Sequence, residues 1–158
     1  HPSNPLAPGA LEALETEMNV NVYGLIRTAQ LFAPVLERNG GGAFVQLNSI
    51  ASMKTFADFA TYCASKAAAY AITQGLRDVL AAQKTQVLSV HPGPIATDMA
   101  ASIGITDGID GPHVVAEGIV TALARGDFHL FPDTMARDVG AAYASFAEKI
   151  IAEPLIEA

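Results

Sequence analysis

Apolar residues recur every three or four positions between Leu11 and Leu36, which is the spacing of one face of an α-helix. Glutamates gather in the first half of this stretch, where the dipole of a helix favours negative charge. Pro34 removes a backbone donor and is expected to kink the end of the helix. The pattern predicts a helix over about 11–36, preceded by a polar, proline-rich loop over 1–9.

Two short apolar runs, 43–48 and 86–91, have the length and the branched or aromatic composition of buried strands. Glycines precede the first run, and the sequence Pro92-Gly93-Pro94 ends the second. The chain between the runs is rich in alanine from Thr61 to about Gln83, which favours a long helix. The glycine-rich segment that extends to Gly111 is predicted to be mobile.

The last third of the chain continues the alternation of helix and strand. A helix is predicted over 112–125 with proline at its start, a strand over 128–131 and a terminal helix from 134 to about 152. Helices that alternate with short apolar strands indicate the α/β class, in which a parallel sheet carries helices on both faces. Ligands of such sheets bind beyond the carboxyl ends of the strands, so Ser49 and the Pro92–Gly93 loop are expected to line one crevice.

The composition limits the number of domains, the partners and the cellular compartment that are expected for the protein. Its 158 residues are 51% hydrophobic, which is enough to bury one core, so a single domain over 1–158 is expected. A formal net charge of −7 with scattered basic residues argues against a nucleic-acid partner or an anionic membrane surface. No apolar run approaches the roughly 20 residues that cross a bilayer. One cysteine excludes an internal disulfide, and we interpret the protein as cytoplasmic.

The histidines give no sign of a metal site. They are His1, His91, His113 and His129, and none has metal-ligand spacing with another or with Cys63. No metal is predicted, and structural or surface roles are expected for the histidines. Cys63 is interpreted as a packed, unreactive residue.

Tyr62 and Lys66 stand four positions apart in the alanine-rich stretch, so a helix there projects both side chains from one face. A phenol with its ordinary pKa near 10 is a poor base at neutral pH, but a nearby ammonium favours the phenolate and lowers that pKa. We hypothesise that the two residues act as one acid/base unit. Pairs with this spacing also occur by chance on helix surfaces. The surrounding motifs therefore decide between a catalytic pair and an ordinary surface pair.

Four motifs occur along the chain in a specific order. Residues 21–24 read Asn-Val-Tyr-Gly, the run 44–52 carries Ser49 at a strand end, residues 62–66 read Tyr-Cys-Ala-Ser-Lys, and residues 92–97 read Pro-Gly-Pro-Ile-Ala-Thr. Seen alone, the asparagine, the serine and the Pro-Gly turn would each be ordinary polar or turn residues. Together they resemble the N-x-x-G, serine, YxxxK and P-G-x-x-x-T motifs of the short-chain dehydrogenase/reductases. The resemblance is to the C-terminal catalytic portion of that family, and it is diffuse after the last motif.

The resemblance implies a role for each catalytic residue. Tyr62 would donate a proton to the carbonyl oxygen during reduction or take one during oxidation. Lys66 would lower the Tyr62 pKa and hydrogen-bond the nicotinamide ribose, while Ser49 would orient the substrate oxygen. Asn21 would hold a water that links the lysine to solvent, which requires a local irregularity in its helix.

The resemblance also implies a cofactor, NAD or NADP. The loop from Pro92 to Thr97 would approach the carboxamide end of nicotinamide, with the Ile95 backbone and the Thr97 hydroxyl as hydrogen-bonding partners. The implied cofactor-binding residues are Tyr62, Lys66, Pro92, Gly93, Ile95 and Thr97. The choice between NAD and NADP depends on a residue beside the ribose in a part of the family fold that this sequence lacks.

The family fold begins with a strand and a glycine-rich TGxxxGxG turn and continues to an N-N-A-G motif, and neither motif is in this sequence. By resemblance, the chain is a partial Rossmann-like domain: the C-terminal half, with about three strands and four helices, without the N-terminal nucleotide-binding half. The strand that ends at Asn48 would then be an exposed edge. We expect the parent protein to be an enzyme and this chain alone to be inactive.

The implied reaction is hydride transfer between NAD(P)(H) and a small alcohol, ketone or aldehyde. One alternative is a noncatalytic dinucleotide-sensing or scaffold protein of the same fold, against which the presence of all four catalytic residues argues. Another is a sugar epimerase or dehydratase of the same superfamily, for which the region after Thr97 leaves little room. A homo-oligomer, dimer or tetramer, is implied as well.

Residues around the motifs are assigned less specific roles. Phe56, Phe59 and the segment 100–111 are expected to form an apolar substrate pocket with a movable lid, although both phenylalanines could equally be core. Asp133 and Arg137 are interpreted as surface or turn residues.

Overall fold

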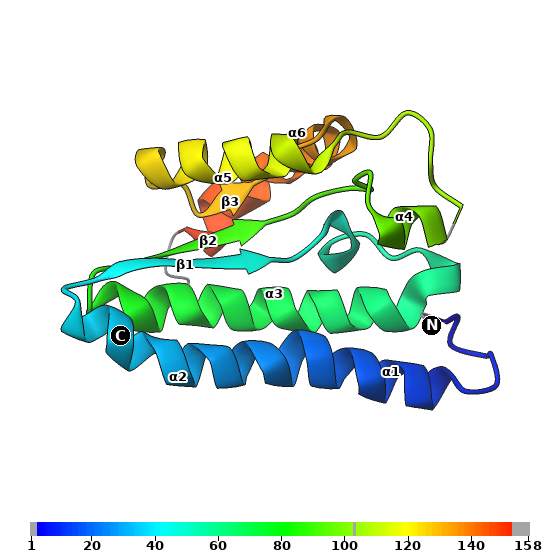
Figure 1. The fold of residues 1–158 in the computed structure, drawn as a ribbon, viewed down its shortest axis with the longest axis horizontal. Helices are drawn as coiled ribbons and strands as arrows, with labels where there is room; N and C mark the ends of the chain where they lie inside the picture. Colours follow the sequence, from blue (N-terminus) through cyan, green and yellow to red (C-terminus); the bar gives the residue numbers. More distant parts are fainter. Residues whose placement is uncertain (1–2, 103, 153–158) are drawn as a thin grey trace.

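The computed structural model describes residues 3–102 and 104–152 (Figure 1). Its strands are β1 (Gly42–Leu47), β2 (Thr85–Val90) and β3 (His129–Leu130). Its α-helices are α1 (Ala10–Met18), α2 (Gly24–Arg38), α3 (Ala60–Ala81), α4 (Asp98–Ser102), α5 (Pro112–Arg125) and α6 (Thr134–Phe146). A π-helical turn, Asn19–Tyr23, joins α1 to α2, and a second, Ala147–Ile151, extends α6. Short 3₁₀ turns, Ile50–Ser52 and Ala57–Phe59, lead into α3.

The strands form a parallel sheet in the order β1-β2-β3, with Leu47 beside Val90 and Val90 beside Leu130. α2 and α3 pack on one face of the sheet and α5 packs on the other, so the fold has three layers (Figure 1). Helical segments separate the strands along the chain, because neighbouring parallel strands need a crossover connection. The predicted α/β class is confirmed.

The core lies on both faces of β2. Val87 packs in one cluster with Leu25 of α2 and Leu80 of α3, whereas Leu88 packs with Ala122 of α5 on the opposite face. Successive strand residues point to opposite faces of a sheet, so a central strand covered on both sides needs apolar residues at consecutive positions. This is why a short apolar run marked this strand in the sequence.

β1 is an edge strand, as predicted for the strand that ends at Asn48. Gly42 and Asn48 donate their backbone N–H groups to carbonyl groups on the β2 side. Backbone groups alternate in direction along a strand, so Ala43, Val45 and Leu47 present theirs at the open edge. The Leu47 side chain there is 52% exposed.

Several elements differ from those predicted. The glycine-rich segment before Gly111 contains a short helix that was not predicted, α4, whose first turn carries Asp98 where the helix dipole favours an acid. β3 is only two residues long, and Pro34 lies inside α2, which continues to Arg38. Within the described residues, no helix is both long enough and apolar enough to cross a membrane.

Candidate active site

Tyr62 and Lys66 lie on the first turns of α3, and the Lys66 Nζ is 5.7 Å from the centroid of the Tyr62 ring. The start of this helix is fixed by the N-terminal segment. The Thr61 N–H donates to the Ser3 carbonyl at 3.2 Å, and the Ser3 N–H donates to the Thr61 hydroxyl at 2.9 Å. These contacts satisfy a backbone donor that a helix start otherwise leaves unpaired, and they fix the residue next to Tyr62.

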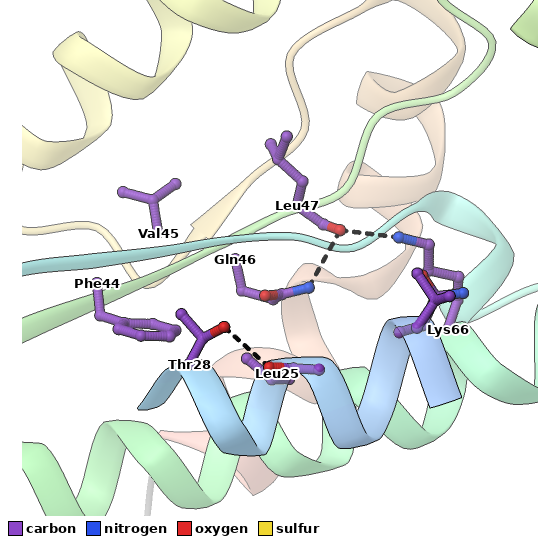
Figure 2. A pocket seen from close by; sticks show the side chains of 10 residues that line it. Leu25, Thr28, Phe44, Val45, Gln46, Leu47 and Lys66 are labelled. Carbon is purple, nitrogen blue, oxygen red and sulfur yellow. Dashed lines mark hydrogen bonds between the residues drawn. The ribbon is translucent and has the colours of Figure 1, made fainter. Parts of the chain in front are cut away.

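The Lys66 ammonium points to the open edge of β1. It donates to the Leu47 carbonyl at 2.9 Å, and the Gln46 side-chain amide donates to the same oxygen at 3.3 Å (Figure 2). Burial lowers the pKa of Lys66. The ammonium borders an open groove of about 400 Å³ between the helical segment around α2 and the edge strand. The groove is lined by Val20, Asn21, Gly24, Leu25, Thr28, Phe44, Val45, Gln46, Leu47 and Lys66.

Ser49 follows the carboxyl end of β1, and Pro92 follows the carboxyl end of β2. The Ser49 hydroxyl accepts the Ala51 N–H at 3.1 Å, which caps the short 3₁₀ turn, and donates to the Pro92 carbonyl at 3.3 Å. The same carbonyl accepts the Ile50 N–H at 3.0 Å. The structure therefore joins Ser49 to the Pro92–Gly93 loop at one end of the sheet, as the sequence predicted.

The electrostatics of Tyr62 differ from the sequence-based expectation. Burial raises the pKa of the Tyr62 phenol, and the Ser49 hydroxyl offsets part of this rise. Charges on Cys63 and Glu17 raise the pKa further. The loss of phenolate hydration therefore outweighs the lowering that the sequence predicted from Lys66, whose ammonium is directed at Leu47. Tyr62 is therefore protonated at neutral pH, which is the form that donates a proton.

Asn21 lies in the π-helical turn Asn19–Tyr23, where the Gly24 N–H reaches back to the Asn19 carbonyl. The helix thus contains the local irregularity that the resemblance requires. The Asn21 amide donates to the Ser65 hydroxyl at 2.9 Å, and that hydroxyl donates to the Tyr62 carbonyl at 2.8 Å. Ser65, which is fully buried, connects Asn21 to the helix that carries the tyrosine and the lysine.

The predicted cofactor loop is tied to its neighbours along its length. The Gly93 N–H donates to the Asp133 carboxylate at 2.7 Å. Further along, the Ala96 N–H donates to the Asp110 carbonyl at 2.9 Å, and the Thr97 hydroxyl donates to the Ile95 carbonyl at 3.2 Å. Ile95 is half-buried and Thr97 is exposed, so the hydroxyl is accessible to a ligand.

Asp133 corrects the sequence interpretation, because its side chain is only 2% exposed and is not a surface residue. It is the N-cap of α6, and its carboxylate accepts the Ala136 N–H at 3.0 Å. Arg137, by contrast, is exposed as predicted. An aspartate directly before a helix is a recognisable N-cap signal in a sequence. Its burial against the Gly93 loop depends on the tertiary fold and has no such signal.

His91 is fully buried directly behind Ser49. Its Nε2 is 2.7 Å from the Ser89 hydroxyl, and its Nδ1 is 3.2 Å from the Ser49 carbonyl and 3.0 Å from the Ser52 hydroxyl. Burial lowers the pKa of His91 to about 3. The residue is therefore a neutral hydrogen-bonding bridge beneath the candidate site. Residues 3–102 and 104–152 hold no group of three or more His, Cys, Asp or Glu side chains that could bind a metal ion.

The expected substrate pocket is placed only in part. Phe56 is 42% exposed and so is not a core residue, whereas Phe59 is half-buried. Ala100 to Ser102 belong to α4, and position 103 of the expected lid lies outside the described residues. Cys63 is buried, and its sulfur accepts the Phe56 N–H at 3.5 Å, in keeping with a packing role.

The sequence matches known oxidoreductases over most of its length. An uncharacterized oxidoreductase of Staphylococcus saprophyticus is 31% identical over 125 residues, which are 78% of this chain and 53% of that protein. One of Staphylococcus aureus is 29% identical over 124 residues, which are 78% of this chain and 54% of that protein. The chain therefore spans about half the length of the curated relatives it matches.

Solved structures share the fold. A short chain dehydrogenase from Burkholderia cenocepacia in complex with NADP has a TM-score of 0.83 and 30% identity, and the match covers 98% of this chain and 66% of that one. A 7α-hydroxysteroid dehydrogenase complexed with NADH and 7-oxo glycochenodeoxycholic acid has a TM-score of 0.73 and 23% identity, over 82% of this chain and 56% of that one. At the latter identity the likeness shows the fold alone.

The short chain dehydrogenase family matches residues 2–107, a region that contains the serine, the tyrosine, the lysine and the Pro-Gly loop that the structure gathers at one end of the sheet. The chain belongs to the short chain dehydrogenase family.

Proposed function

We propose that the protein interconverts an alcohol and a ketone or aldehyde with NAD or NADP, and that this chain supplies the proton-transfer residues. The observation that carries the proposal is that Ser49 lies in hydrogen-bonding contact with Tyr62, beside Lys66, at the carboxyl ends of β1 and β2. Ligands of parallel sheets bind at this end. The Pro92–Thr97 loop borders the same position.

The donors around this position suit a nicotinamide nucleotide. An ammonium on Lys66 and a hydroxyl on Thr97 match ribose hydroxyls and a carboxamide, which accept hydrogen bonds through oxygen. Gly93 lacks a Cβ where the loop backbone makes its close approach to a carboxylate. The NADP and NADH in the two dehydrogenases of the same fold support this assignment. The residues proposed to hold the cofactor are Tyr62, Lys66, Pro92, Gly93, Ile95 and Thr97.

Bound nicotinamide supplies or accepts hydride at the substrate carbon. The side chains of the protein transfer the proton and orient the substrate oxygen. The Ser49 hydroxyl orients the substrate oxygen, and Tyr62, which burial keeps protonated, donates its proton as that oxygen gains negative charge. The Lys66 ammonium, on the next turn of α3, stabilises the phenolate that remains. In the oxidation direction Tyr62 takes the proton back.

Asn21 and Lys66 line the same groove, so a water held beside Asn21 can lie close to the Lys66 ammonium. We assign to Asn21 the role of holding a water there, so that a proton can pass between Lys66 and solvent. The contact from the Asn21 amide to Ser65 keeps the turn at a fixed distance from α3. Asn21 thus acts through a water and does not touch the substrate.

The open edge of β1 supports a second half of the domain. A buried parallel strand normally has a neighbour on each side, and β1 has only β2 among the described residues. We propose that a nucleotide-binding half pairs with this edge, so that residues 1–158 alone bind the cofactor poorly and are inactive. We also propose a cytoplasmic homo-oligomer that acts on a small-molecule substrate.

The proposal is tested by incubating the purified full-length protein with NADH or NADPH and a panel of ketones and aldehydes. Loss of the near-ultraviolet absorbance of the reduced nicotinamide is the expected result. Binding of dinucleotide without turnover of any carbonyl would instead indicate a noncatalytic protein. The 158-residue chain serves as the comparison, and a tight cofactor complex with it would contradict the proposed need for a second half.

A further inference from the structure

A buried carboxylate joins the proposed cofactor loop to the start of α6. The Asp133 side chain is 2% exposed, with one oxygen 2.7 Å from the Gly93 backbone nitrogen and the other 3.0 Å from that of Ala136. A charged carboxylate is costly to bury unless its oxygens accept hydrogen bonds. Here each oxygen accepts a backbone N–H, and the N-terminus of a 13-residue helix adds a favourable dipole.

The Gly93 backbone lies close to the start of α6, and its tightest approach is to the aspartate. A Cβ built on Gly93 would lie 2.8 Å from the Asp133 Oδ1, which is closer than real Cβ atoms come. Gly93 does not have a positive φ, so backbone conformation alone does not require glycine at this position. The glycine of the Pro-Gly motif is instead explained by contact with Asp133 and with the first turn of α6, where the same Cβ would lie 3.3 Å from the Met135 Cβ.

A second link holds the far end of the loop to the same helix start. The Asp110 carboxylate accepts the Thr134 N–H at 2.9 Å, while the Asp110 carbonyl accepts the Ala96 N–H at 2.9 Å. The Asp133 link is buried and direct, whereas Thr134 and Ala96 are both exposed. The start of α6 therefore fixes the loop at two points, and the buried one lies next to Pro92 and Ser49.

We propose that Asp133 is a positioning residue for cofactor binding. It holds the Pro92–Thr97 loop in the position where the loop contacts the nicotinamide. This inference rests on the proposed function of that loop. Asp133 touches neither cofactor nor substrate and acts through the Gly93 backbone. Its loss allows the loop to move away from the position that the carboxamide needs.

Two substitutions separate this role from helix capping. Asparagine and serine are helix N-caps about as good as aspartate, so both preserve the contact with Ala136. In Asp133→Asn the side-chain NH₂ group faces the Gly93 N–H, so two donors meet and no hydrogen bond forms. In Asp133→Ser the side chain is too short to reach the Gly93 N–H while it caps α6. Asp138→Asn is the matched control, because Asp138 is an exposed aspartate of the same helix.

The experiment measures the dissociation constants of NADPH and NADH with the full-length proteins by fluorescence titration, together with amide hydrogen exchange of the segment 92–97. The expected result is binding weakened about tenfold or more in Asp133→Asn and Asp133→Ser, since a hydrogen bond to a charged group is lost. Exchange should accelerate in this segment and stay unchanged in Asp138→Asn. If Asp133 acted only as a helix cap, its substitution would change thermal stability but neither the cofactor dissociation constants nor the hydrogen exchange of the segment 92–97.

The outcomes distinguish the two levels of the proposal. If the wild-type protein binds dinucleotide and both Asp133 variants bind it equally well, the positioning role is overturned while the proposed function stands. If the wild-type full-length protein binds neither dinucleotide, the proposed function fails and the positioning role fails with it.

Discussion

His91 makes the stability of the protein depend on pH in a way that the structure allows to be calculated. The imidazole is fully buried, and burial lowers its pKa from 6.5 to about 3, although the Ser49 carbonyl favours the charged form. Charges on His129 and Lys66 lower the pKa further. In the unfolded chain the same residue returns to its ordinary pKa of about 6.5.

The sign follows from which state takes up the proton. Above about pH 6.5 His91 is neutral in both states, and its contribution to stability is fully present. As the pH falls from 6.5 toward 3, the unfolded chain binds a proton that the folded protein does not, so the free energy of unfolding decreases. Between about pH 7 and pH 5 the expected loss from this one residue is about 2 kcal/mol.

The assay is urea denaturation of the full-length protein at several pH values over this range. We expect His91→Gln to be less stable than wild type at neutral pH, because it loses buried hydrogen bonds, but to lose about 2 kcal/mol less on acidification. His113→Gln, at an exposed histidine of α5, should keep the wild-type pH dependence. Parallel stability curves for wild type and His91→Gln would refute the reasoning. Burial also lowers the pKa of His129 to about 4, but His129 remains in all three proteins, so its contribution cancels in the comparison.

Two further substitutions test the core and the link to the asparagine. Leu88→Ala should lower the free energy of unfolding by about 2–5 kcal/mol in urea denaturation, because Leu88 is fully buried. Leu11→Ala, at an 83% exposed position, should change it by less than about 0.5 kcal/mol. Equal effects of the two substitutions would contradict the assigned core. Ser65→Ala should cost about 1 kcal/mol and reduce turnover, because the Asn21 amide loses its acceptor. An unchanged turnover number would show that this link does not support the proposed proton route.

The elements that the sequence predicted well are those with local signals. The alanine-rich stretch and the proline at the start of α5 specify helices through propensity and capping, and both ends of α5 match the prediction. Ser49 and Pro92 follow strand ends, and parallel topology alone brings such positions together. The irregularity at Asn21 has no local signal of this kind, and only the resemblance pointed to it.

The predictions that failed concern burial, which sequence patterns do not report. Asp133 follows a strand end and is interpreted from the sequence as a surface or turn residue; it does lie at a chain turn, the N-cap of α6, but it is buried against the Gly93 backbone. The Tyr62 pKa was expected to fall because Lys66 lies one turn away. Burial of the phenol, together with the charges on Cys63 and Glu17, raises this pKa instead, and the Ser49 hydroxyl offsets only part of the rise. α4 was missed because five residues carry too weak a periodicity.

The central claim, that Tyr62 exchanges the proton with the substrate oxygen, is tested most directly by single-turnover carbonyl reduction with the full-length protein and bound reduced cofactor. Tyr62→Phe should slow this step by about a hundred- to ten-thousand-fold when both proteins are saturated with reduced cofactor. Tyr143→Phe removes a phenolic oxygen that contacts Tyr70 away from the site, and it should reduce at nearly the wild-type rate. A Tyr62→Phe protein that reduces the carbonyl within a few fold of wild type would contradict the account.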